Sequence, residues 1–360
     1  MERQCTELDF AGQDVWVGLD VAKRSWKVCI LVGELFHRRF SQEPDVLALA
    51  HYLKRNFPGA QYHCVYEAGY SGFWIHDQLR ALGIECIVVN PADVPTSDKE
   101  RRVKTDRIDA RKLARGLRGK ELRPVYVPDR AALEDRTLVR TRARYIRKQT
   151  RCKLQIKSLL EFYGYSAPED LVERYWSREY LRWIESISLT ELSGRESLGA
   201  LVKELFFLRD MILHLTRQVR HLSNQERYQS RVRLLCTIPG IGIITAMTLV
   251  TELVRIDRFP NLDALASYVG LVPGEQSSGE SEYHTGISPR RNAALRHMLI
   301  ESAWVAQHQD PALMMAFSAL SHRMPKNRAI VRIARKLLNR VRYVMKNEEP
   351  YMKAVLQSPR

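Results

Sequence analysis

The stretch WVGLDVAK, residues 16–23, is a short apolar run with one carboxylate, Asp20, in its middle. Residues 26–32 predict a second strand, so Asp20 is expected near the end of the first strand of a hairpin. A carboxylate inside a strand is costly to bury unless something pairs with it, and a metal ion is one such partner. An edge-strand aspartate that faces water is the alternative, and this stretch alone does not decide between them.

Two later stretches carry carboxylates in comparable places. HCVYEAGYSG, residues 63–72, predicts a strand that ends in Glu67 and runs into a glycine-containing turn. KTDRIDARKLA, residues 104–114, favours a helix on which Asp106 and Asp109 share one face. Oxygen ligands of this kind suit Mg²⁺, or Mn²⁺ in its place, and two such ions roughly 4 Å apart hold both reacting oxygens of a phosphodiester. A solvated charged turn is the alternative for the helical pair.

Composition narrows the class of partner. The chain has 360 residues, enough for two or three domains, and 57 Lys and Arg against 41 Asp and Glu give a net charge of +16. This excess indicates a polyanion, most simply nucleic acid. Neither an apolar run of membrane-spanning length nor a signal peptide is recognisable, so we expect no membrane role. Six scattered cysteines without a C-x-x-C pair fit a reducing cytoplasm and predict no zinc site.

Residues 1–125 predict an α/β domain. The expected elements are two strands that flank Lys23, a strand at 35–40, a helix at 44–57, a strand at 62–67, a helix at 72–82 and a strand at 85–89. Hairpins that lead into a β-α-β unit form a mixed sheet, and this order resembles the ribonuclease-H-like fold, whose acidic residues gather at one edge of the sheet. The polar and basic residues 96–107, which include Lys104 as a candidate nucleic-acid contact, predict a loop.

Residues 126–228 predict two long helices. The first, at 131–163, carries nine basic residues and no acidic one between Arg136 and Lys157. Nine like charges repel one another, so a polyanion-binding face is favoured over a solvated one. Its candidate contacts are Arg144, Arg147, Lys148 and Arg151. The second, at 198–222, has a coiled-coil seam of apolar residues, preceded by a capping box at Ser193 and Glu196, and can pair within the chain or between subunits. Residues 165–188 between the helices are irregular and aromatic, and are expected to pack into the core.

Residues 229–350 predict a small, mainly helical domain. IPGIG, residues 238–242, joins two helices in the manner of a helix–hairpin–helix, where Gly240 and Gly242 let backbone amides approach a phosphate. A tight packing turn is the alternative. Residues 268–281 are rich in Gly and Ser and predict a loop, with an ordinary linker as the alternative.

Two further helices are expected after this loop. The first has Ser288 as its N-cap and Pro289 as its first residue, with Arg290, Arg291 and Arg296 placed to hold phosphates. A last basic helix spans 326–346 and has an apolar stripe as its inner face.

Several of these stretches together resemble the DEDD transposases, recombinases of insertion sequences that encode a bridge RNA, with the Piv-type DNA invertases as kin. GLDVAK at 18–23, YEAGYSG at 66–72, NP at 90–91 and KTDRIDAR at 104–111 resemble the first domain of that family. IPGIG at 238–242 and GLVPGEQSSG at 270–279 resemble its C-terminal transposase domain. The resemblance covers nearly the whole chain, in the order of the family.

The resemblance implies a RuvC-like domain, a coiled coil and a C-terminal domain with a nucleophilic serine. The acidic tetrad, catalytic and metal-binding, falls on Asp20, Glu67, Asp106 and Asp109. The serine falls on Ser278, with Ser277 as a neighbour that is not excluded. The implied function is excision and insertion of a mobile element through a covalent phosphoserine. The implied partners are DNA, a guiding bridge RNA and further copies of the chain in a dimer or tetramer.

Other classes of protein remain open. A sugar-kinase or actin-like ATPase shares the sheet topology, but its phosphate loop wants Gly and Ser or Thr after the strand aspartate, where this chain has Val-Ala-Lys. A Holliday-junction-type nuclease, or a DNA invertase, would use the acidic tetrad. In a non-catalytic nucleic-acid-binding protein the acids would be structural.

Overall fold

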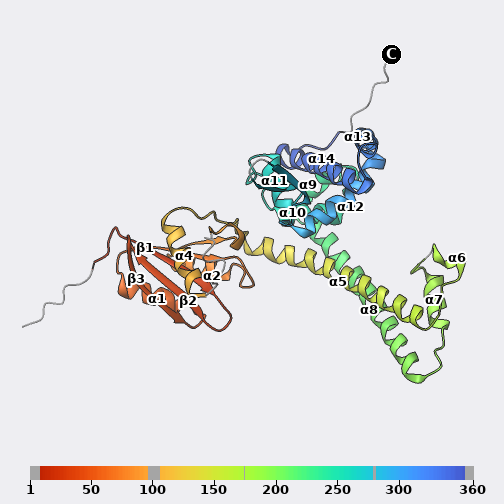
Figure 1. Ribbon diagram of the computed structural model, residues 1–360, viewed down its shortest axis with the longest axis horizontal. Coiled ribbons are helices and arrows are strands. Elements are labelled where there is room, and N and C mark those ends of the chain that lie inside the picture. The colour runs from red at the N-terminus through yellow and green to blue at the C-terminus, as the bar shows by residue number, and fades with distance from the viewer. Residues whose placement is uncertain (1–8, 96–105, 174, 279–280, 353–360) are drawn as a thin grey trace, which may run out of the picture. The chain divides into compact units, whose positions relative to one another are not determined.

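The computed structural model describes residues 9–95, 106–173, 175–278 and 281–352, and within these the side chains of 106–108 and 274–285 fall outside the description. The chain divides into two compact units, residues 1–127 and 128–360 (Figure 1). Each unit has its own apolar core. Among the described helices, none is both long and apolar enough to cross a membrane.

The first unit contains a mixed sheet of five strands in the order β3-β2-β1-β4-β5. The strands are β1 (Asp14–Val21), β2 (Trp26–Val32), β3 (Leu35–Gln42), β4 (Gln61–Glu67) and β5 (Glu85–Val89). β2 is antiparallel to both β1 and β3, whereas β4 is parallel to both β1 and β5. Leu19 pairs with Tyr66, so Asp20 and Glu67 follow a matched pair at the same edge of the sheet. The predicted ribonuclease-H-like α/β class is confirmed.

Helices cover both faces of this sheet (Figure 1). On one face α1 (Val46–Asn56) and α2 (Trp74–Ala81) bury the apolar side chains that alternate along β1, because successive strand residues point to opposite faces. On the other face lies α4 (Asp106–Arg118). A Cβ at Gly18 would lie 2.0 Å from the carbonyl oxygen of Ala110, so only glycine lets α4 lie this close to β1. A short 3-10 turn, η1 (Pro91–Asp93), follows β5 and is capped by the Asn90 side chain.

Two long helices open the second unit. α5 (Arg130–Phe162) is capped by the side chain of Asp129, and it packs along α8 (Leu192–Ser223) within the chain. The buried residues of α8 follow the predicted apolar seam: Leu198, Leu205, Leu208, Leu215, Val219 and Leu222. The predicted capping box is wrong, because α8 begins at Leu192, after an N-cap at Glu191. The stretch predicted as irregular holds α6 (Glu169–Val172) and α7 (Arg178–Ser186), whose buried Tyr180 joins the core between the long helices.

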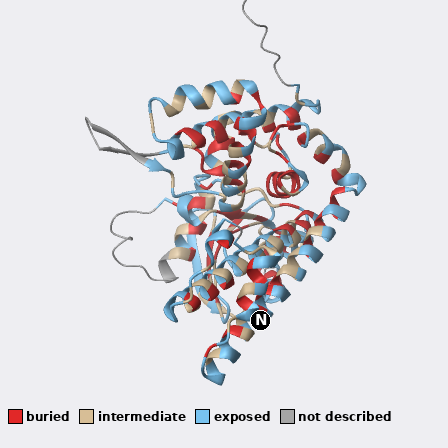
Figure 2. Ribbon diagram, turned by 90° about the vertical axis from the view of Figure 1, so that its right-hand side faces the viewer, coloured by how far each residue is buried: buried red, intermediate tan, exposed pale blue. Residues whose placement is uncertain are grey.

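The rest of the second unit is mainly helical and shares one core with the start of α5 and the end of α8. Its helices are α9 (Glu226–Leu235), α10 (Ile243–Leu253), α11 (Leu262–Val269), α12 (Ala293–Gln309), α13 (Pro311–Ser321) and α14 (Lys326–Asn347). Figure 2 shows buried residues on the inner sides of the helices and exposed residues outside. Helix α10 is buried over most of its length, and the hydroxyls of its buried Thr248 and Thr251 donate to backbone carbonyls of the same helix.

A two-stranded antiparallel ribbon interrupts these helices where a loop was predicted. β6 (Pro273–Ser278) and β7 (Ser281–Ile287) pair from Pro273 with Ile287 to Ser278 with Ser281. The loop prediction is wrong because cross-strand pairing overrides the turn propensity of Gly and Ser. The predicted N-cap at Ser288 is also wrong: α12 begins at Ala293, and Asn292 caps it by accepting the backbone N–H of Leu295 at 3.2 Å.

Candidate active site

Three of the four predicted carboxylates line one pocket in the first unit. Asp20 at the end of β1, Glu67 at the end of β4 and Asp109 in the first turn of α4 surround a cavity of about 130 Å³. Apolar and small residues complete its wall, among them Leu19, Ala68, Gly69 and Leu113. The fourth residue, Asp106, begins α4, and its side chain lies outside the described residues.

Local structure explains why these acids meet. The parallel register sets the ends of β1 and β4 side by side, and the close contact at Gly18 sets α4 over them. The turn after Glu67 is held by the Tyr66 hydroxyl, which donates to the carbonyl of Gly72 at 2.9 Å, and by the Ala68 amide, which donates to Val89 at 2.7 Å. Burial is the main reason why the pKa of Tyr66 is raised above its ordinary value, so this phenol stays a donor at neutral pH.

The chemistry of this donor set suits a hard divalent cation. Carboxylates gathered in one cavity repel each other unless a cation or a proton neutralises them. Among the side chains that the structure describes, no three acidic, histidine or cysteine groups lie close enough together to hold one metal ion as they stand. Asp20 and Glu67 each take part in interactions in this structure. The pocket thus brings together three carboxylate side chains of the type that a hard cation binds, and the side chain of Asp106 lies outside the described residues.

The serine predicted as nucleophile lies at the end of the β6–β7 ribbon. Ser278 is the last residue of β6 and pairs with Ser281, while Ser277 pairs with Glu282. Gly279 lies outside the described residues. At the other end the ribbon is fixed to the helices, where the amide of Ser288 donates to Val272 at 3.0 Å and the amide of Asn292 donates to Tyr268 at 3.1 Å.

Arg296 was predicted to hold a phosphate, but the structure gives its guanidinium another use. Its Nε donates to the carbonyl of Gly270 at 3.0 Å, and its Nη1 and Nη2 donate to the carbonyl of Ser288 at 3.2 and 2.7 Å. A guanidinium is a planar fork of donors, so one side chain can join two backbone segments in this way. Arg290 and Arg291, the other two predicted phosphate contacts, are exposed just before α12.

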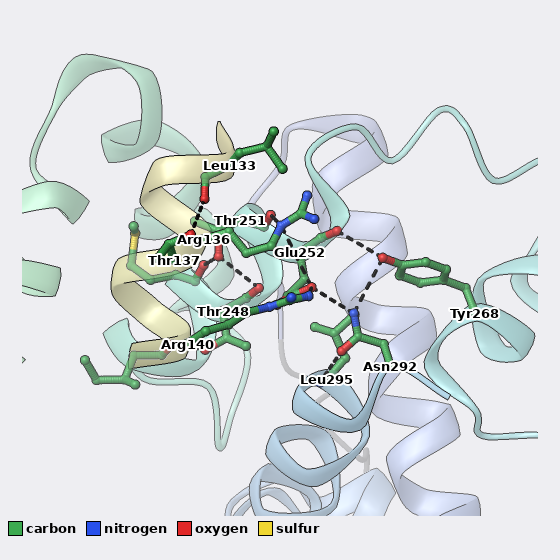
Figure 3. Close-up of polar contacts among 12 residues, drawn as sticks. Leu133, Arg136, Thr137, Arg140, Thr248, Thr251, Glu252, Tyr268, Asn292 and Leu295 are labelled. Carbon is green, nitrogen blue, oxygen red and sulfur yellow. Dashed lines mark hydrogen bonds and ion pairs between the residues drawn. The ribbon is translucent and has the colours of Figure 1, made fainter. Parts of the chain in front are cut away.

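A buried charge cluster connects the base of the ribbon to α5 (Figure 3). Glu252, near the end of α10, is 1% exposed. It accepts two hydrogen bonds from Arg140, at 2.6 and 2.8 Å, and one from the Asn292 side chain at 2.8 Å. Burial alone would raise the pKa of Glu252, but the hydrogen bonds from Arg140 and Asn292 outweigh burial and leave the pKa lowered. Sequence reasoning missed this cluster, although a lone carboxylate in an apolar helix was a visible signal.

The basic helix is therefore used in two ways. Arg140 binds Glu252, Arg136 donates to the carbonyl of Thr251 at 2.9 Å, and Arg142 donates to Thr216 at 2.7 Å. The guanidinium groups of these three residues therefore bind groups of the protein itself. The four named candidates, Arg144, Arg147, Lys148 and Arg151, are all exposed, and Lys148 also lies over the ring of Tyr145.

The two glycines of IPGIG differ in their surroundings. Gly240 has a φ of +82°, and a Cβ there would lie 2.3 Å from the carbonyl oxygen of Ser302, which favours the packing-turn alternative. Gly242 is the N-cap of α10 and has open space around it. The remaining candidate contact, Lys104, lies outside the described residues.

Comparison with known proteins places these features in context. Residues 17–165 match a family model for DEDD transposases of IS110 elements, described as a transposase, and residues 232–319 match one described as the transposase IS116/IS110/IS902 family. The putative transposase y4rJ of Sinorhizobium fredii is 32% identical over 362 residues, which cover 90% of each chain. The putative transposase y4qE of the same organism is 34% identical over 247 residues, 69% of this chain and 59% of that protein. The pilin gene-inverting protein of Moraxella lacunata is 24% identical over 353 residues, 94% of this chain and 98% of that protein.

Proposed function

Because the chain belongs to the IS116/IS110/IS902 family of transposases, and so acts on DNA as a transposase or recombinase, we propose that it cuts and rejoins DNA with two sets of residues. The first set is Asp20, Glu67, Asp106 and Asp109. The second is Ser278 of the β6–β7 ribbon. The observation that carries the proposal is the shared pocket of Asp20, Glu67 and Asp109, because clustered carboxylates can hold the divalent cations that assist phosphodiester exchange.

In the proposed step, Ser278 Oγ forms a bond to phosphorus and the bond from phosphorus to one deoxyribose oxygen breaks. The serine gives up its proton, and the leaving oxygen departs as a hydroxyl after taking one up. The phosphodiester is thereby exchanged for a phosphoserine ester, which the hydroxyl of a second strand reseals by the reverse reaction. No external energy source is needed, since one phosphate ester replaces another.

Serine is a weak nucleophile at neutral pH and needs activation. A divalent cation held by the acidic set, Mg²⁺ or Mn²⁺, would polarise the phosphate and stabilise the leaving oxygen. Both sets must reach the same phosphate, from one chain or from two copies. A dimer or tetramer, which would allow the second arrangement, is part of the proposal. Site choice by a bridge RNA is the remaining part, and the exposed basic residues of α5 are compatible with RNA as well as with DNA.

The test is to trap the reaction on a suicide DNA substrate with divalent metal and to look for a protein–DNA adduct. We expect Ser278→Ala to abolish the adduct and Ser277→Ala largely to keep it. Asp20→Asn should remove activity and leave DNA affinity in place. Strand cleavage that survives Ser278→Ala would instead indicate a nuclease that uses the acids alone, and activity that survives both changes would contradict the proposal entirely.

DNA inversion is a second candidate, favoured by the likeness to the pilin gene-inverting protein over nearly the whole chain. The chemistry at each phosphate would be the same. A plasmid with the two ends in direct orientation, compared with one in inverted orientation, separates excision from inversion by the size of the product.

A further inference from the structure

Helix α14 has a basic surface that neither set of proposed catalytic residues uses. Its 22 residues contain eight basic side chains and no acidic one. Three of the eight are occupied. Arg335 is paired with Asp263, Arg340 with the buried Asp310 at 3.1 Å, and Arg342 donates to the carbonyl of Pro260 at 3.1 Å.

The remaining basic residues are exposed, and three of them follow one another at intervals of four. Arg328, Arg332 and Lys336 form what we call the α14 stripe. No ion pair among the described side chains involves any of the three. Like charges four residues apart destabilise a helix, so a stripe without intervening acids is unfavourable in the free protein and favourable once an anion lies along it. The steps are about 6 Å each, since a helix rises about 1.5 Å per residue.

The α14 stripe belongs to the helix that borders the base of the Ser278 ribbon. Arg335, which lies between Arg332 and Lys336 in the sequence, donates to the carbonyl of Leu271 at 3.4 Å, two residues before β6. Its partner Asp263 lies at the start of α11, the helix that leads into the ribbon. A phosphate backbone bound along the stripe would therefore run past the segment from which the ribbon starts.

We propose that Arg328, Arg332 and Lys336 bind the phosphate backbone of the DNA duplex whose strand Ser278 attacks. The identity of the DNA rests on the proposed function, whereas binding along the stripe does not. Phosphate-backbone binding of this kind positions the duplex and carries no sequence information, so the stripe would act equally on element ends and on target.

The experiment compares the full-length triple variant R328Q/R332Q/K336Q with a matched control, R178Q/R182Q/R195Q. The control removes the same charge from exposed arginines that have acidic neighbours in sequence, Glu179, Glu185 and Glu196. The readout is the slope of log affinity for a DNA duplex against log salt. This slope is negative, and its magnitude should decrease by about 0.9 for each phosphate that is no longer neutralised. We expect the magnitude of the slope of the α14 variant to decrease by roughly three times this amount, and the control to keep the wild-type slope.

A second readout separates this inference from the proposed function. Adduct formation by the α14 variant should fall at limiting DNA and recover at saturating DNA, because the stripe affects binding rather than chemistry. If Ser278→Ala still forms the adduct, the assignment of Ser278 as the nucleophile is wrong. The salt slope still tests whether the α14 stripe binds phosphates. An unchanged slope in the α14 variant, an equal decrease in the control, or a decrease seen with RNA and not with duplex DNA would each overturn the inference. Thermal melting of both variants checks that they are folded.

Discussion

Arg296 donates to the carbonyl oxygen of Ser288 through both of its terminal nitrogens, at 3.2 and 2.7 Å. Its third donor, Nε, reaches the carbonyl of Gly270. Gly270 precedes β6 and Ser288 follows β7, so one side chain of α12 fastens both ends of the ribbon that carries Ser278. The ribbon is thereby held at its base by a helix that packs into the core.

Arg296→Ala should slow adduct formation at saturating DNA by about tenfold or more, because a misplaced nucleophile loses the advantage of orientation. The rate of adduct formation by Arg296→Lys should lie between those of the wild type and Arg296→Ala, since a single ammonium cannot match the guanidinium fork. Hydrogen exchange of peptides from residues 271–288 should quicken in the alanine variant, while α10 stays protected. In the control Arg291→Ala we expect weaker DNA binding instead. A full rate with normal exchange in Arg296→Ala would contradict this role.

Gly18→Ala should destabilise the first unit by about 2 kcal/mol or more, since a Cβ 2.0 Å from the Ala110 carbonyl forces β1 and α4 apart. Metal affinity should fall too, as Asp109 moves with α4. Urea unfolding and calorimetric titration with Mn²⁺ measure the two effects. Gly199→Ala is the control: Gly199 lies in α8 with nothing near its Cβ position, and the change should stabilise by up to about 1 kcal/mol. Normal stability and metal binding in Gly18→Ala would show that the close approach of β1 and α4 is not needed.

Glu252→Gln should destabilise the second unit at neutral pH by about 1 to 2 kcal/mol, because it removes the buried carboxylate that binds Arg140, and the half-exposed Arg140 regains part of the loss from water. The lowered pKa of Glu252 fixes the sign of the pH effect. A carboxyl with a lowered folded-state pKa contributes stability above its unfolded pKa, near 4.5, and loses it as the pH falls through the lower folded value. The difference between wild type and variant should therefore be largest from pH 6 to 7 and shrink below about 4.5. Unfolding curves at several pH values measure it, and a constant difference would contradict the assignment.

Replacing Arg144, Arg147 and Arg151 by Gln should reduce the salt slope of nucleic-acid binding by about 0.9 for each phosphate that these side chains neutralise. These residues are exposed on α5, so folding should be unaffected. Filter binding with DNA and with a structured RNA tells which of the two this face holds. If the slope is unchanged with both DNA and RNA, this face of α5 is only a solvated surface and the prediction is wrong.

The sequence predicted the elements whose periodicity is strong. The strands of the first unit and the long helices agree with the structure to within a few residues, because alternation and heptad spacing report directly on burial. The ribbon at 273–287 escaped prediction, since its Gly and Ser carry turn propensity and its pairing depends on residues across the ribbon. The start of α12 was misplaced because Ser288 and Asn292 are both good caps, and tertiary contacts of Asn292 decide between them.

For the site, sequence spacing indicated which acids belong together, and the register of β1 with β4 explains why Asp20 and Glu67 meet. What spacing could not tell was which basic residues are occupied. Arg140 and Arg144 are one helical turn apart on α5, yet Arg140 is bound to Glu252, more than 100 residues later in the chain, and Arg144 faces solvent. Only the tertiary fold separates a structural arginine from one that is available to a ligand.

The way the ribbon is fastened also bears on how such a protein can diverge. The hydrogen bonds described at its base come from Arg296, Asn292 and backbone groups outside the paired strands, so lengthening or recomposing the tip leaves these attachments unchanged. A ribbon from a relative, grafted between Val272 and Ser288, would keep the same two attachments to Arg296, at Gly270 and at Ser288. Exchange of this one segment between family members would then leave the helical core and its contacts to the ribbon as they are.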